Sequence, residues 1–260
     1  MASNYWADRI ARAQSAIFEK NDKAINAQLR KYYAKAMERT IADFEHTYTK
    51  LLAALDKDVS PTPADLYKLD TYWKMQSNLR QELQRLGDKQ IAVMSKVFET
   101  NYFEIYYSFA WEGMEAFSTL DTSAVQQLIN QIWVADGKSW SARIWQNTEL
   151  LVETLNDELI NCVATGKPAS HLKKALMERF NVSYSRADAL ARTELAHIQT
   201  EAAKKRYEDY GIQQVEIWAD KDERRCDVCG KLHQTKYFVG EKMPIPAHPR
   251  CRCCIVPVVE

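Results

Sequence analysis

Apolar side chains recur every three or four positions through most of the first 210 residues, which is the spacing of amphipathic helices. In the N-terminal part this spacing predicts four helices, over residues 4–20, 22–57, 66–86 and 91–109. Asn21-Asp22 can cap the second helix and Gly87 is expected to end the third, while the fourth should stop near residues 113–117. The second helix alone would be roughly 50 Å long, so we expect an extended hairpin or bundle.

The helical pattern continues after residue 120 and then gives way to alternation. The expected helices cover residues 122–133, 139–162, 170–180 and 184–210, with Gly211 placed to terminate the last of them. Three segments alternate as half-buried strands do, namely residues 214–219, 236–239 and 255–259. We therefore predict a boundary near residue 120, between a helical N-terminal region (1–119) and a C-terminal domain (120–260) whose helices fill 120–210 and whose small β lobe fills 211–260.

Five of the six cysteines lie in that lobe, between residues 226 and 254. Cys226 and Cys229 form a CxxC pair, and His248 and Cys251 follow about twenty residues later, a combination typical of zinc sites. Gly230 suits a tight turn between the paired thiolates, because glycine accepts a positive φ without steric cost. We predict one structural zinc ion held by these two cysteines, His248 and Cys251.

The fourth ligand has a close competitor. In an extended segment Cys251 and Cys253 point to one face and Cys254 to the other, so Cys253 is the alternative ligand and Cys254 is expected in the core. The first residues lack the apolar run and cleavage site of a signal peptide, so we expect synthesis in the cytosol with reduced thiols. Disulfides, or thiols that merely pack, are the other readings of the cluster.

The composition changes this picture little. Thirty-five basic residues balance thirty-five acidic ones, so net charge favours neither a nucleic acid nor a membrane as partner. No run of about eighteen apolar residues predicts a membrane span. Residues 221–252 carry eight lysines or arginines against four acidic residues, which is either a phosphate-contacting surface or an ordinary solvated one.

One polar stretch in the last helix carries candidate chemistry. Arg192 and Glu194 are two residues apart, so they do not face each other and each needs a partner elsewhere. His197 shares a face with Glu194, and together with His248 these residues would form the centre of a zinc-dependent enzyme. The alternative, which we favour, is that Arg192 and Glu194 form a structural motif that ties the helix to the β lobe. No nucleophile with its base, glycine-rich phosphate loop or HExxH motif is visible, so we expect no catalytic activity.

Taken in order, several motifs over residues 120–260 resemble the phage Mu F-like family of head morphogenesis (minor capsid) proteins. These are Trp140-Ser-Ala-Arg-Ile-Trp145, Arg179-Phe-Asn-Val-Ser183, Ala191-Arg-Thr-Glu194, Tyr210-Gly-Ile212, Cys226-x-x-Cys229 and His248-Pro-x-Cys251-Arg-Cys253. The chain departs from the family pattern at Leu232-His-Gln234, where an acidic residue and a glycine are expected. Larger members carry toxin or transferase domains, and we expect none here because the sequence stops just after the cysteine motif and one strand.

The resemblance implies a structural minor capsid protein of the virion interior, present in the host cytoplasm during head assembly. Its implied partners are the portal or major capsid protein and in some cases DNA; self-association is an option, and no membrane partner is expected. The alternatives are the zinc-dependent enzyme, a nuclease or other hydrolase, and a zinc-containing nucleic-acid-binding protein. The predicted fold class is mostly α: a long-helix N-terminal bundle or hairpin, then a helical plus small β, zinc-stapled C-terminal domain.

Overall fold

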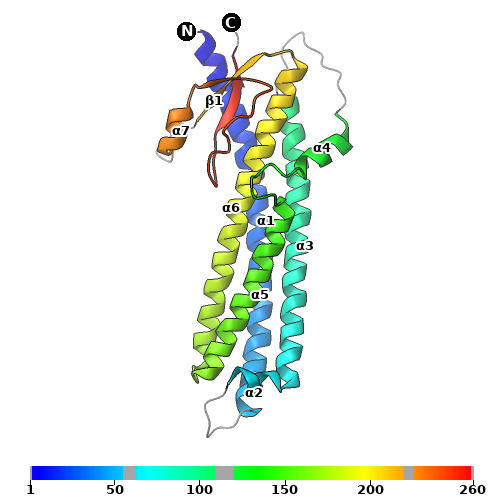
Figure 1. The fold of residues 1–260 in the computed structure, drawn as a ribbon, viewed down its shortest axis with the longest axis vertical. Helices are drawn as coiled ribbons and strands as arrows, with labels where there is room; N and C mark the ends of the chain where they lie inside the picture. Colours follow the sequence, from blue (N-terminus) through cyan, green and yellow to red (C-terminus); the bar gives the residue numbers. More distant parts are fainter. Residues whose placement is uncertain (1, 55–61, 109–119, 220–224, 259–260) are drawn as a thin grey trace. The chain divides into compact units, whose positions relative to one another are not determined.

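A computed structural model describes residues 2–54, 62–108, 120–219 and 225–258, which are mainly helical with a small sheet near the C-terminus (Figure 1). This confirms the predicted fold class at the level of mostly α structure with a small β part. The helices are α1 (Ala2–Ala54), α2 (Pro63–Tyr67), α3 (Asp70–Tyr107), α4 (Thr122–Ile129), α5 (Trp140–Ala164), α6 (Ala169–Asp209) and α7 (Asp227–Leu232). The strands are β1 (Gln214–Trp218), β2 (Lys236–Phe238) and β3 (Cys254–Pro257). None of the described helices combines the length and apolar content that crossing a membrane requires.

The long helices run through three positions where we predicted breaks. Helix α1 continues past Asn21-Asp22, α3 continues past Gly87, and α6 continues past residues 181–183. The predicted cap at Asn21 was wrong because its amide donates to the carbonyl of Ile17 one turn earlier and so is satisfied inside the helix. The expected helix start at residue 122 holds, with the Asp121 carboxylate accepting from the N–H of Ser123, and so does the expected helix end at Gly211, at φ +70°. The predicted ends near residue 57 and near residues 113–117 lie outside the described residues.

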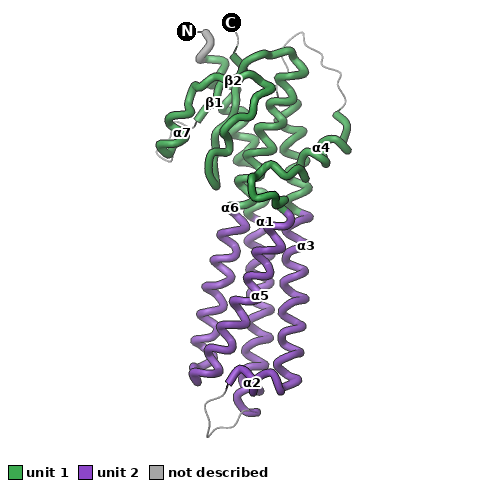
Figure 2. Tube along the Cα trace, in the orientation of Figure 1, with its two compact units in different colours: residues 1–26, 93–140, 189–260 green, residues 27–92, 141–188 purple. Residues whose placement is uncertain are grey.

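Contacts between Cα atoms divide the chain into two compact units (Figure 2). Unit 1 contains residues 1–26, 93–140 and 189–260, and unit 2 contains residues 27–92 and 141–188. Each unit therefore draws on both the N-terminal and the C-terminal part of the sequence. The predicted boundary near residue 120 stays a prediction, because spatial compactness does not test where a family domain begins.

Unit 2 contains α2 and segments of α1, α3, α5 and α6, and a buried hydrogen-bond network links the four longer helices. The Tyr33 hydroxyl lies 3.3 Å from Gln90 Oε1 and 3.2 Å from Ser183 Oγ, and the Asn147 amide donates to the Ser183 carbonyl over 3.0 Å. Each of the four helices contributes one of these side chains. Burial raises the pKa of Tyr33 to about 12, so its hydroxyl stays protonated at neutral pH.

Gly87 lies inside α3, where it does not end the helix but makes room for a side chain of a neighbouring helix. A Cβ atom at this position would lie 2.5 Å from Cζ3 of Trp145 in α5. Real Cβ atoms do not come that close to another heavy atom, so the missing side chain is what allows the indole ring to reach α3. The glycine therefore marks a helix–helix contact within unit 2.

In unit 1 the three strands form one antiparallel sheet in the order β2-β1-β3, with Trp218 paired to Cys254. One face packs on the start of α1, where Ala7 and Ala11 join Trp218, Cys254 and Val256 in a buried apolar cluster. The Gln14 side chain extends this contact by donating from Nε2 to the Ile255 carbonyl over 2.7 Å. One face of the sheet is thus covered by apolar residues of α1, while the cysteines lie at α7, in the loop before β3 and at the start of β3.

Candidate metal centre

The CxxC pair sits at the start of a helix that the pattern of apolar residues did not predict. Cys226 is the N-cap of α7, and its sulfur accepts the N–H of Cys229 over 3.4 Å. The predicted positive-φ turn at Gly230 was wrong, because this residue lies inside α7 and its N–H donates to the Cys226 carbonyl over 2.8 Å. The hydrogen bond from the Cys229 N–H lowers the pKa of Cys226, which favours its thiolate form.

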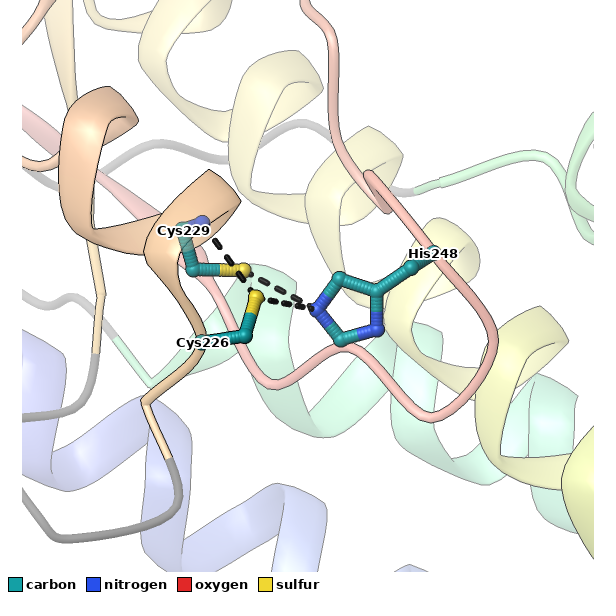
Figure 3. A group of neighbouring side chains, drawn as sticks. All are labelled: Cys226, Cys229 and His248. Carbon is teal, nitrogen blue, oxygen red and sulfur yellow. Dashed lines mark hydrogen bonds between the residues drawn. The ribbon is translucent and has the colours of Figure 1, made fainter.

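His248 points at both sulfurs of the pair, as Figure 3 shows. Its Nε2 atom lies 3.3 Å from Cys226 Sγ and 3.1 Å from Cys229 Sγ. Its Nδ1 atom lies 2.8 Å from the carbonyl oxygen of Pro249. Because a carbonyl only accepts, this contact calls for a proton on Nδ1; the hydrogen bond to Pro249 raises the pKa of His248, and a metal ion would bind through Nε2 once that atom is deprotonated. Histidine ligands of metals are commonly oriented in this way.

A second group of possible metal ligands shares Cys229 with the first group. The sulfurs of Cys229, Cys251 and Cys253 lie within 4.8 Å of one another, as do the ligand atoms of Cys226, Cys229 and His248. Cys251 is fully buried, and its sulfur lies 3.8 Å from that of Cys229. A hydrogen bond with the Cys253 thiol lowers the pKa of Cys251 to about 5.

Three separations are near those around a tetrahedral zinc ion, although Cys251 shares its group of close donors with Cys229 and Cys253 rather than with Cys226 and His248. With Zn–S bonds of about 2.3 Å and Zn–N bonds of about 2.0 Å, two sulfurs lie about 3.8 Å apart, and a sulfur and a nitrogen about 3.5 Å. In the structure the Cys229 and Cys251 sulfurs are 3.8 Å apart, and His248 Nε2 lies 3.1–3.3 Å from the sulfurs of Cys226 and Cys229. Burial raises the pKa of Cys229 to about 12, and a bound cation would instead stabilise its thiolate. The cluster can therefore hold a metal ion, and the choice between His248 and Cys253 as ligand stays a prediction.

Cys254 takes the position expected from strand alternation. It is the first residue of β3, it is 5% exposed, and it belongs to the apolar cluster on α1 rather than to the donor groups. Its sulfur lies 3.8 Å from the Trp218 carbonyl. The neighbouring residues Cys253 and Cys254 therefore have different environments, the first among the donor groups and the second in the apolar core.

Three consecutive residues of α6 reach three different parts of unit 1. Arg192 pairs with Asp22 of α1, with 3.2 Å between Nε and Oδ1. Thr193 Oγ1 accepts the backbone N–H of Arg250 over 3.0 Å, in the loop that carries His248 and Cys251. Glu194 is 4% exposed and its Oε2 accepts from the indole N–H of Trp133 over 2.8 Å. The predicted structural role of Arg192 and Glu194 stays a prediction, but these contacts are of the kind it requires.

His197 is not placed as an acid–base group would be. Its ring stacks on that of Trp133, with 4.3 Å between centroids and 16° between planes. Burial lowers its pKa to about 4, which keeps it neutral near pH 7. The partners Asp22, Trp133 and Thr193 were missed by the sequence reasoning. The available signal was a polar residue at each of three successive positions, 192 to 194, so that these side chains point to different sides of the helix.

Residues 153–256 match the family described as Phage Mu protein F like protein. The predicted family resemblance is confirmed over this segment. The Mu F-like segment contains about the second half of α5, all of α6, the sheet apart from its last residue, and the cysteine cluster.

The chain is also similar to a curated protein, NAD(+)–arginine ADP-ribosyltransferase EFV of Enterococcus faecalis, with 25% identity over 188 residues. The match covers 64% of this chain but only 38% of that protein, so the chain spans well under half the length of its relative. No solved structure matches the chain.

Proposed function

We propose that this chain is a structural minor capsid protein that acts in phage head morphogenesis. The match of residues 153–256 to the Mu F-like family carries the proposal. It acts in the host cytoplasm during assembly and then resides inside the virion. Its partners are the portal or the major capsid protein, with packaged DNA as a further contact.

The site supports a structural rather than a catalytic reading. The proposed ion is zinc, and the four donors Cys226, Cys229, His248 and Cys251 would fill a tetrahedral shell, whereas a catalytic zinc keeps a position open for water. Zinc would fix the loops around β3, in a lobe whose three strands contain five, three and four residues. Such a small sheet gains folding free energy from a metal staple.

The residues of the rival enzyme centre have other partners in the structure. Glu194 accepts from Trp133, and His197 is stacked on the same indole with a lowered pKa. ADP-ribosyl transfer is the named activity of the longer relative, and a match to 38% of that protein is no basis for proposing it here.

The assembly role is tested by co-expressing the chain with the portal, scaffold and major capsid proteins of its own phage. Procapsids are purified by sedimentation, and their protein content is measured by quantitative mass spectrometry. We expect the chain in procapsids at low copy number, and a reduced amount when the portal is left out. Absence from procapsids would refute the proposal.

The metal is tested separately, on the purified chain, by elemental analysis and X-ray absorption at the zinc edge. One zinc ion with four protein ligands supports the staple. A zinc ion with a bound water would instead favour the enzyme reading, and a chain without metal would refute the staple while leaving the assembly test intact.

A further inference from the structure

The loop that carries His248 and Cys251 is hydrogen-bonded to helix α6 between these two donors. The backbone N–H of Arg250 donates to Thr193 Oγ1 over 3.0 Å. The same hydroxyl donates to the Ala189 carbonyl over 2.7 Å, so its direction is fixed by the helix. Thr193 therefore offers Arg250 an acceptor whose position is set by α6.

Arg250, which makes this hydrogen bond, has an unfavourable backbone conformation. Arg250 has a φ of +64°, in the left-handed region that side chains other than glycine rarely adopt. This conformation turns the chain between His248 and Cys251, and the Cys251 N–H closes the turn by donating to the His248 carbonyl over 3.1 Å. The turn lies between the two donors, so its shape sets where His248 and Cys251 lie relative to each other.

We infer that Thr193 is a positioning residue for the metal centre. Its hydroxyl holds the strained turn at Arg250, and through that turn it places His248 Nε2 and the Cys251 sulfur toward Cys226 and Cys229. The inference rests on the proposed metal staple. It adds that the position of the loop carrying His248 and Cys251 depends on its contact with helix α6. The Thr193 residue of the Ala191-Arg-Thr-Glu194 stretch would thus act on the metal without touching it.

The test compares metal binding by four full-length chains: wild type, Thr193→Val, Thr193→Ser and Thr200→Val. Valine keeps the shape of threonine and removes the acceptor, while serine restores it. Thr200 is the matched control because it lies on the same helix in the same unit and its hydroxyl also donates four residues back, to Ala196, over 2.9 Å. Circular dichroism confirms that each variant keeps its helices.

Each chain is titrated with Co²⁺, whose visible spectrum reports ligand type and geometry, and zinc affinity is then measured by competition with a chelator. Loss of one ordinary hydrogen bond predicts a three- to tenfold weaker zinc affinity for Thr193→Val, with a changed Co²⁺ d–d spectrum. We expect Thr193→Ser and Thr200→Val to match the wild type in both measurements.

A Thr193→Val chain with unchanged affinity and spectrum would overturn the inference. So would equal weakening in Thr193→Val and Thr200→Val, because the effect would then come from the helix rather than from the loop. A wild-type chain that binds neither Co²⁺ nor zinc would instead refute the metal staple itself, and the inference would fall with it.

Discussion

Replacing Gly87 with alanine should destabilise unit 2, although glycine-to-alanine changes inside helices usually stabilise. In an ordinary helix the change gains about 1 kcal/mol. Here the new Cβ would lie 2.5 Å from Cζ3 and 2.9 Å from Cη2 of Trp145, so the ring or a helix has to move. Forcing extra atoms into a packed contact costs about 1–3 kcal/mol.

Alternatively, the Trp145 ring can relieve the clash by rotating into solvent. Trp145 is 37% exposed, so a side chain of this size keeps on the order of 150 Å² buried. At about 25 cal/mol per Å², full exposure forfeits up to about 4 kcal/mol. Both routes cost at least as much as the helix gains, and we expect a net loss of up to about 2 kcal/mol in the free energy of unfolding.

The assay is chemical denaturation of wild type, Gly87→Ala, Trp145→Leu and the double variant. Leucine removes the ring, so alanine at position 87 should then stabilise by about 1 kcal/mol. The sign of the alanine effect should therefore reverse between the two backgrounds. A Gly87→Ala chain more stable than the wild type, or the same alanine effect in both backgrounds, would refute the packing explanation.

Three further predictions concern the β lobe and the buried network. Cys226→Ala should abolish metal binding and make residues 211–258 protease-sensitive while the helices persist, whereas Cys254→Ala should keep the metal; equal metal loss in both would contradict the ligand assignment. Gln234→Gly should raise stability by up to about 1 kcal/mol, because Gln234 has a φ of +63°, and chemical denaturation showing a loss would refute this. Above pH 10 the unfolded chain ionises at position 33 while the folded Tyr33 titrates at about 12, so roughly 2–3 kcal/mol of stability present below pH 10 should be lost by pH 12. A Tyr33→Phe chain with the same pH dependence would refute that attribution.

The departure at Leu232-His-Gln234 shows what a local sequence pattern can reveal. The family resemblance predicts a glycine there, and the structure places Gln234 in the left-handed conformation that glycine adopts most easily. The family pattern therefore predicted the backbone conformation of this turn correctly, although this chain has glutamine where the pattern has glycine. The Ala219 N–H donates to His233 Nδ1 over 3.3 Å, which attaches the same turn to the end of β1.

The sequence by itself determined the periodic elements, the change from helix to strand after Gly211, and the cysteines that compete for a metal. These are local properties, since side-chain spacing and ligand spacing are read within one or two turns of the chain. The separation of Cys254 from Cys251 and Cys253 also followed, because alternation along an extended segment fixes which side chains share a face.

Only the tertiary structure decided where helices continue and what their polar residues do. Gly87 was predicted as a helix end because glycine commonly terminates helices. The reason it occurs inside α3 is its contact with the Trp145 ring, which lies 58 positions away in the sequence. Thr193 was visible only as one of three successive polar residues, and its partner could not be read locally because Arg250 comes from a loop 57 residues later. Capping and turn preferences are worth about 1 kcal/mol, and a packed contact between distant segments outweighs them.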